Sequence, residues 1–212
     1  MLPLHKMKKT VVAFILLFFI ASKTDAQKRF IPGLKAGLST SQVDGDTYTG
    51  YDKTGFDGGA FVTGKLSDKW SAQFEILFIQ KGSKHNPNPD KGDYTFYKMQ
   101  LNYMEVPVLV QYHLKKFTFE LGPGFGYLLT AKEYNGYGEL TGTLPFYQTE
   151  ANFNLGISYT LFKNIGINWR YSSSFLAIRN HESGLGPWYN PGEINKVMAF
   201  TVTYRFGSEK TE

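Results

Sequence analysis

The stretch Lys196–Phe206 reads Lys-Val-Met-Ala-Phe-Thr-Val-Thr-Tyr-Arg-Phe and alternates large apolar side chains with small or polar ones. Side chains of a β-strand point to opposite faces in turn, so this stretch predicts a strand with one apolar and one polar face. A strand of a soluble protein would show the same alternation. Here the pattern recurs along the chain behind an export signal, which favours the last strand of a closed barrel whose outer face contacts lipid. The apolar positions are Met198, Phe200, Val202, Tyr204 and Phe206.

Seven earlier stretches are assigned as strands in the same way, and the chain holds 18 Phe, 14 Tyr and 22 Gly, a composition that suits strands and tight turns. Before Tyr103 the alternation shifts phase, which predicts a β-bulge. We therefore predict an all-β fold, an eight-stranded antiparallel up-and-down transmembrane β-barrel. The seven stretches cover residues 30–40, 55–66, 70–81, 99–114, 117–130, 146–161 and 165–178.

The connections between these strands alternate in length, as they do in outer-membrane barrels, where short turns are periplasmic and long loops extracellular. The tight turns lie at residues 67–69, 115–116 and 163–164. The long loops lie at residues 41–54, 82–98, 131–145 and 179–195.

The N-terminal segment has the pattern of a secretory signal, with a basic Lys8-Lys9 flank, the apolar run Val11–Ile20 and the small-residue end Thr24-Asp25-Ala26. We predict a cleaved signal peptide at residues 1–26 and an outer-membrane barrel domain at residues 27–212, with Met7 as an alternative start. The other interpretation is a membrane anchor, but spanning a bilayer takes about twenty apolar residues.

The net charge and the cysteine content limit the cellular locations and the classes of partner that the sequence allows. Residues 1–26 carry a net charge of +3, which leaves +2 of the formal +5 for the rest of the chain, too little to indicate a nucleic-acid partner. An exported chain without cysteine suits a bacterial envelope and has no thiolate metal site. We expect outer-membrane lipid and lipopolysaccharide as surroundings, an envelope or secretion protein as a possible partner, and no cofactor.

The polar faces of the strands decide which side points inward. A lipocalin-type barrel also has eight strands, but its apolar residues surround an internal ligand. Here the polar faces combine charged residues with Gly, Ser, Thr and Asn, which suits a narrow filled lumen, while the bulky aromatic residues suit lipid.

Six charged residues on these polar faces form a predicted ion-pair network, because acidic and basic residues fall on opposite walls of an eight-stranded ring. An unpaired charge buried there would be costly, so we expect the charges to meet across the lumen as a structural plug. A gated ion path is the alternative. The six are Lys35, Glu75, Glu105, Glu120, Arg170 and Arg205.

The long loops are rich in aromatic residues, and Tyr134, Tyr137, Trp188 and Tyr189 are candidates for recognition of a glycan or a protein. An aromatic girdle at the membrane interface is the other interpretation. The group Asp44-Gly45-Asp46 with Asp52 lacks a full calcium-loop signature and predicts an ordinary turn, and no metal ligand is assigned.

No catalytic residue is nominated, because His85, His113 and His181 occur outside any recognisable nucleophile or metalloprotease motif. Outer-membrane enzymes on barrels keep an enzymatic reading open by analogy alone.

Six segments carry a family resemblance, namely Gly33–Leu38, Leu66–Trp70, Glu75–Phe78, Gln80–Gly82, Leu101–Leu109 and Tyr204–Phe206. Through them the chain resembles the outer-membrane β-barrel domain proteins of Bacteroidota, the "porin family" or PorT-like group. The resemblance implies an eight-stranded outer-membrane barrel with no settled activity. We expect a structural, adhesive or envelope-assembly role, with a small-solute channel and a PorT-like secretion component as alternatives. The tail Gly207–Glu212 departs from the many barrels that end at the final aromatic residue.

Overall fold

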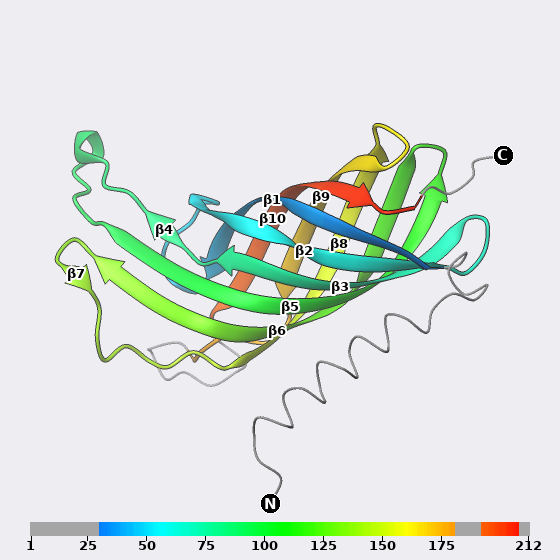
Figure 1. Ribbon diagram of the computed structural model, residues 1–212. Helices are drawn as coiled ribbons and strands as arrows, with labels where there is room; N and C mark the ends of the chain where they lie inside the picture. The colour runs from blue at the N-terminus through cyan, green and yellow to red at the C-terminus, as the bar shows by residue number, and fades with distance from the viewer. Residues whose placement is uncertain (1–29, 181–191, 208–212) are drawn as a thin grey trace, which may run out of the picture.

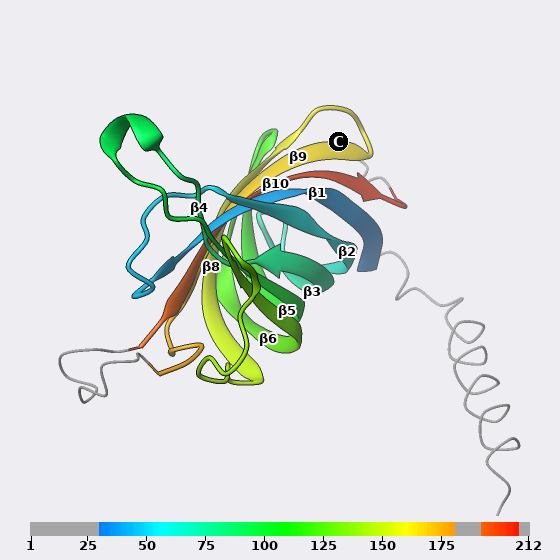
Figure 2. The same ribbon diagram turned by 90° about the vertical axis from the view of Figure 1, so that its left-hand side faces the viewer.

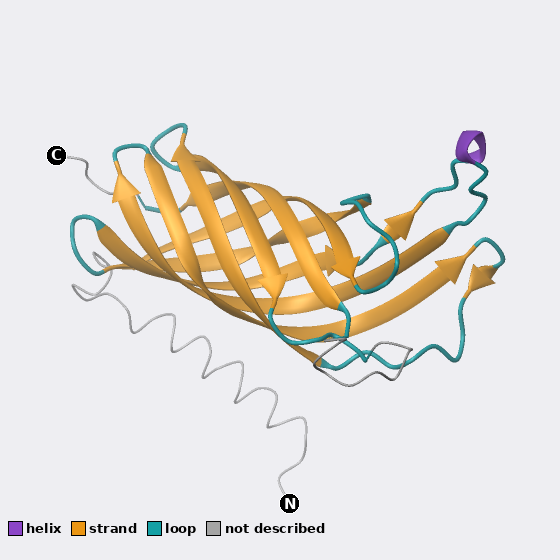
Figure 3. Cartoon of the chain, turned by 180° about the vertical axis from the view of Figure 1, so that it is seen from behind, coloured by secondary structure: helices purple, strands orange, loops and turns teal. Residues whose placement is uncertain are grey.

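A computed structural model of the chain describes residues 30–180 and 192–207, in which eight long antiparallel strands close into a barrel (Figures 1 and 3). Around the ring the order is β5-β3-β2-β1-β10-β9-β8-β6, and the pairing of β5 with β6 completes it. The predicted fold class is confirmed. The strands are β1 Phe30–Asp44, β2 Lys53–Lys65, β3 Trp70–Lys81, β5 Tyr97–Leu114, β6 Phe117–Asn135, β8 Thr149–Thr160, β9 Ile165–Ser174 and β10 Ile194–Arg205.

The apolar faces point outward, as the alternation predicts. Along β10 the residues Phe200 and Val202 are 56% and 54% exposed, whereas Ala199 and Thr201, which alternate with them, are buried. The lipocalin-type alternative is therefore wrong, because it requires the apolar face to line the interior. Among the described residues, no helix has the length and apolar character needed to cross a membrane.

The hairpin of β5 and β6 extends beyond the ring at the long-loop end (Figures 1 and 3). It begins at Tyr97 and ends at Asn135, so the predicted loops at 82–98 and 131–145 are partly strand, because two adjacent hairpin strands continue to pair with each other. Short strands pair with the projecting open end of this hairpin, namely β4 Lys84–His85 with the start of β5 and β7 Gly138–Glu139 with the end of β6, and the 3-10 helix η2 Pro89–Lys91 follows β4.

Several other predicted bounds also differ: β1 continues to Asp44 instead of residue 40, and β10 begins at Ile194 instead of residue 196. β8 begins at Thr149 instead of 146, and β9 ends at Ser174 instead of 178. Beyond β9 the chain bends, and only an isolated bridge between Arg179 and Glu193 continues the pairing toward β10. The chain around Arg179 therefore belongs to the rim of the barrel.

The predicted bulge lies where the phase shift placed it, between Asn102 and Tyr103 of β5. The extra residue is on the partner strand, since Asn102 pairs with Thr130 and Tyr103 with Leu128, which leaves Leu129 of β6 unpaired. One inserted residue exchanges the two faces of a strand. Even-numbered residues of β6 such as Glu120 point inward below the bulge, and the odd-numbered Glu133 points inward above it.

The interior has an apolar layer toward the long-loop end and polar layers below it. Glycines on the inner face of β6 allow the two neighbouring strands, β5 and β8, to approach closely. A Cβ at Gly122 would lie 2.0 Å from the carbonyl oxygen of Val108, and one at Gly124 would lie 2.3 Å from Oδ1 of Asn152. The apolar layer consists of Val43, Ile79, Met99, Leu101, Tyr103, Ile178 and Val197.

Candidate functional site

The first candidate site is a buried ion cluster around Arg170, which projects from β9 into the lumen. Its Nη1 and Nη2 donate hydrogen bonds of 2.6 and 2.8 Å to the two carboxylate oxygens of Glu75 on β3. Its Nε donates at 2.8 Å to Glu120 of β6, and Nζ of Lys35 lies 3.6 Å from Glu75. All four side chains are buried, so three walls of the barrel are joined through one guanidinium group.

A second ion cluster surrounds Lys81, whose ammonium group contacts Glu105 of β5 and lies 2.8 Å from Oε1 of Glu150 on β8. Amide groups complete the hydrogen bonding of the two carboxylates. Asn152 donates at 2.9 Å to Glu105, and Asn195 donates at 2.7 Å to Glu150. This cluster also crosses the lumen, from β3 to β8.

The structure thus divides the predicted network. It brings Lys35, Glu75, Glu120 and Arg170 together and places Glu105 in a separate cluster. Arg205 lies at the short-turn end of β10, opposite Gly33 of β1, and is not among the buried charges of either cluster.

Sequence reasoning missed Lys81 and Glu150, although the signal was present. Lys81 has the same parity as Glu75 on β3, and Glu150 has the same parity as Asn152 on β8. Both were overlooked because they occupy the ends of their segments, where strand bounds are least certain.

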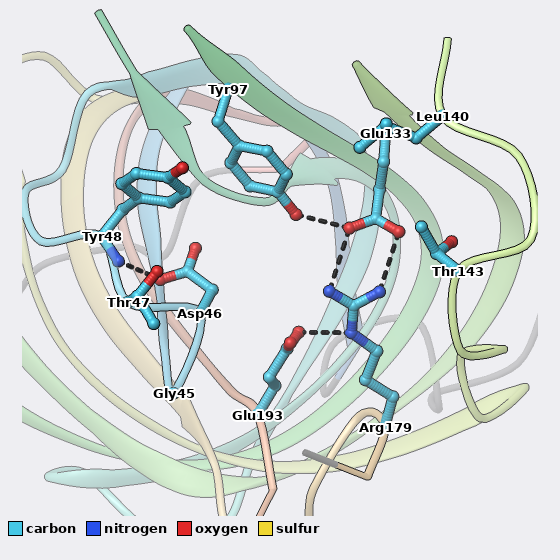
Figure 4. A pocket seen from close by; sticks show the side chains of 10 residues that line it. All are labelled: Gly45, Asp46, Thr47, Tyr48, Tyr97, Glu133, Leu140, Thr143, Arg179 and Glu193. Atoms are coloured by element: carbon cyan, nitrogen blue, oxygen red, sulfur yellow. Dashed lines mark hydrogen bonds and ion pairs between the residues drawn. The ribbon is translucent and has the colours of Figure 1, made fainter. Parts of the chain in front are cut away.

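A third group of charges forms a pocket at the rim of the long-loop end (Figure 4). Arg179 donates through Nη1 and Nη2 to Glu133 at 2.8 and 2.9 Å, and its Nε lies 2.7 Å from Oε2 of Glu193. The hydroxyl of Tyr97 donates to the same Glu133 carboxylate. The bulge in β6 turns Glu133 inward toward this pocket.

On the other side of the pocket lies the turn after β1, which supplies Asp46 and Tyr48. The ring of Tyr48 stacks between His85, at 4.7 Å, and Tyr97, at 4.9 Å between centroids. The cavity has a volume of about 190 Å³. Burial raises the pKa of the Glu193 carboxyl to about 7, and burial likewise raises the pKa of Asp46.

Two of the predicted recognition residues, Tyr134 and Tyr137, are not among the residues that line this pocket. Tyr137 is fully exposed at the turn after β6, and the ring of Tyr134 lies 5.8 Å from Nζ of Lys98. Trp188 and Tyr189 fall outside the described residues, as does the predicted signal peptide.

The predicted turn at Asp44-Gly45-Asp46 and the histidines have ordinary partners. Asp44 pairs with Lys196, and Oδ1 of Asp46 accepts the N–H of Tyr48 at 3.0 Å. His85 lies 2.6 Å from Asp93, and His113 contacts the hydroxyls of Ser71 and Thr118 at the short-turn end. His181 lies outside the described residues.

The fold agrees with the sequence comparison. The model of the family described as outer membrane protein beta-barrel domain matches residues 22–178. The chain belongs to that family. No curated protein matches the chain in sequence.

Solved structures show the same architecture at low sequence identity. Neisserial surface protein A (NspA) is 12% identical, with a TM-score of 0.52, over 82% of this chain and 97% of that one. Ail, the attachment invasion locus protein of Yersinia pestis, is 14% identical, with a TM-score of 0.50, over 84% of this chain and 99% of that one. The likeness shows the fold. The family member described here is thus an outer-membrane β-barrel with the architecture of Ail and NspA.

Proposed function

We propose that this protein is a closed outer-membrane barrel whose lumen serves as a structural plug and whose long-loop end is an adhesive surface for an extracellular partner. The observation that carries the proposal is the pair of ion clusters that cross the lumen. Arg170 joins β9 to β3 and β6, and Lys81 joins β3 to β5 and β8. Buried charges with complete hydrogen bonding hold a barrel closed, because separating them leaves charges unpaired in a site that excludes water.

The shape of the long-loop end supports a surface role. The hairpin of β5 and β6 carries the β4–η2 segment and the turn at Tyr137 away from the membrane (Figure 2, where this end faces the viewer). Tyr137 presents a whole aromatic ring to solvent, and exposed tyrosines of this kind bind sugars and proteins through one apolar face and one hydroxyl. Ail is named an attachment invasion locus protein, so an adhesive role on this architecture has a named example.

The alternatives are not favoured. A small-solute channel requires an open lumen, and here buried side chains of two ion clusters and an apolar layer occupy it. The PorT-like secretion role rests on resemblance alone, since the matched family is a general barrel domain. The same holds for the Bacteroidota assignment. We propose no catalytic role.

Two measurements test the proposal. In planar bilayers the purified protein is expected to give no wide, stable conductance, and a large steady pore would overturn the closed lumen. In cells, a photo-crosslinking amino acid at Tyr137 is expected to capture a partner that the same amino acid at Lys116, in a short turn at the opposite end, does not capture. The absence of any adduct at position 137, or identical adducts at both positions, would overturn the surface role.

A further inference from the structure

The rim pocket carries an excess of negative charge. Three carboxyl groups line it, from Asp46, Glu133 and Glu193, against the single guanidinium group of Arg179. Arg179 faces Glu133 and Glu193 with its three nitrogens, and none of these contacts reaches Asp46 (Figure 4). When all three carboxyl groups are ionised, one positive charge does not balance them, and the pocket then carries a net negative charge.

Two buried carboxylate oxygens in this pocket have no hydrogen-bond partner of ordinary geometry. One is Oδ2 of Asp46, whose side chain is only 9% exposed, and the other is Oε2 of Glu193, which is 4% exposed. Ser83 donates a hydrogen bond to the Asp46 carboxyl group, and Nε of Arg179 lies 2.7 Å from Oε2 of Glu193 as an ion pair, so Oδ2 of Asp46 is the acceptor that no described group reaches. Buried acceptors without donors are costly, and a bound ligand with N–H groups would supply the missing donors.

The walls of the pocket are held in place before any ligand enters. In the turn after β1, the backbone N–H of Tyr48 donates a hydrogen bond to the side chain of Asp46. The ring of Tyr48 stacks on the rings of His85 and Tyr97. Tyr97 is in turn tied to Glu133 by its hydroxyl. A site whose acceptors and walls are already positioned binds with little loss of conformational freedom.

The geometry of the acceptors favours an organic cation. Across residues 30–180 and 192–207, no three carboxylate or imidazole groups come together closely enough to hold a metal ion. The planar donors of a guanidinium are already matched to Glu133 by Arg179. The remaining acceptors belong to separate side chains, which suits the tetrahedral donors of an ammonium group.

We propose that the rim pocket binds the ammonium end of an alkylamine, with Asp46 and Glu193 as the accepting carboxylates. The source of the ammonium group is either a free di- or polyamine or a lysine side chain of a partner. The inference rests on the proposed function in one respect, that the long-loop end faces the exterior of the cell.

The charge state of the pocket agrees with this ligand class. Burial raises the pKa of Glu193 to about 7, and the neighbouring Asp46 and Glu133 raise it further, while Arg179 lowers it. Burial also raises the pKa of Asp46, and hydrogen bonds from Ser83 and Tyr48 and the charge of Arg179 oppose that rise. A bound ammonium group would favour the ionised form of both carboxyls and release protons on binding.

Calorimetric titration of the whole protein in detergent micelles tests the proposal, with cadaverine as the probe. We expect saturable binding above neutral pH. Tetramethylammonium, which carries the charge but no N–H donor, should bind at least about tenfold more weakly. Comparison of cadaverine with Nα-acetyl-lysine amide separates the two sources, because the tighter ligand of the two identifies the class.

The variant Asp46→Asn keeps the Oδ1 acceptor for Tyr48 but removes the charge, so we expect it to fold and to bind cadaverine at least about tenfold more weakly. The matched control is Asp90→Asn, an exposed aspartate in η2, which should bind as the wild type does. Absence of saturable binding by the wild type, equal binding by Asp46→Asn, or equal affinity for tetramethylammonium would each overturn the proposal. Because bilayer conductance and crosslinking at Tyr137 are separate readouts, a failed titration is distinguishable from a failed proposed function.

Discussion

Arg170 and Glu75 lie 95 residues apart in the chain and meet in the lumen through two parallel hydrogen bonds of 2.6 and 2.8 Å. Both side chains are almost fully buried, and the pair joins β9 to β3 across the barrel. A bidentate contact of this kind fixes the orientation of both groups as well as their distance. It therefore determines how two non-adjacent walls of the barrel sit relative to each other.

The variant Arg170→Ala is expected to lower the free energy of unfolding by about 3–5 kcal/mol, since it leaves Glu75 and Glu120 buried without their main partner. Urea unfolding in lipid vesicles measures the change, and planar-bilayer recordings should show no large conductance. The control is Lys132→Ala, which breaks an exposed ion pair with Glu139 and should cost less than about 1 kcal/mol. Equal effects of the two variants would contradict a structural role for the Arg170 cluster.

A double-mutant cycle on Lys81 and Glu105 measures how strongly the ion cluster around Lys81 stabilises the barrel. Lys81→Met should destabilise the barrel strongly, because Glu105 and Glu150 then repel each other in a buried site. Adding Glu105→Gln to Lys81→Met should recover part of the loss, with a coupling of about 0.5–3 kcal/mol. Strict additivity of the two single variants would show that Lys81 does not depend on Glu105.

Glycine on the inner face of β6 is required by the close approach of the neighbouring strand. Gly122→Ala is expected to cost about 1–3 kcal/mol, because its Cβ would lie 2.0 Å from the carbonyl oxygen of Val108 and the strands would have to shift. Gly136→Ala is the matched control, since a Cβ there has nothing within 4 Å. Thermal unfolding of both variants in the same detergent measures the difference, and similar midpoints would show that the strands yield freely.

The outward direction of the apolar faces is tested by a charge placed on them. Phe200→Lys, near the middle of β10, should cost about 2–4 kcal/mol in a lipid bilayer, because the ammonium group would face hydrocarbon. The same replacement at Tyr137, which is exposed at the rim, should be close to neutral. Unfolding in vesicles of defined lipid is the measurement. A neutral Phe200→Lys variant would mean that this face does not contact lipid.

The rim pocket gives the barrel a defined pH dependence. The pKa of Glu193 is about 7 in the folded protein against an ordinary 4.5, so between these values the folded chain holds a proton that the unfolded chain has lost. The free energy of unfolding should therefore fall as the pH rises through this range. Glu193→Gln should flatten this dependence, as measured by urea unfolding at a series of pH values. Parallel curves for the two proteins would assign the pH dependence to other groups.

Much of the fold could be read from alternation, because the side-chain period of a strand is fixed by its backbone. The outward face of β10 follows from that period. The bulge lies beside Tyr103 as predicted, but β5 itself keeps one phase there, and the phase changes in β6 instead. The sequence did not predict which strand carries the extra residue, because a bulge depends on the pairing of two strands. Nothing in the sequence around Leu129 indicates that this residue is unpaired.

The candidate sites could be predicted from the sequence only in part. Sequence parity pointed to Arg170 and Glu75 as lumen residues, but the separation of Glu105 into a cluster with Lys81 depends on strand tilt and on the length of each side chain. The rim pocket had no sequence signal, because its charges come from a turn, an extended strand and the segment beyond β9.

By itself, the sequence determined that the chain forms strands with one apolar and one polar face, and that charged residues belong to the polar face, because local backbone geometry dictates which side chains share a side. Tertiary structure alone decided which charges meet and where an unbalanced pocket remains. Those outcomes depend on register between strands, on one unpaired residue in β6 that turns Glu133 inward, and on distances across a closed lumen.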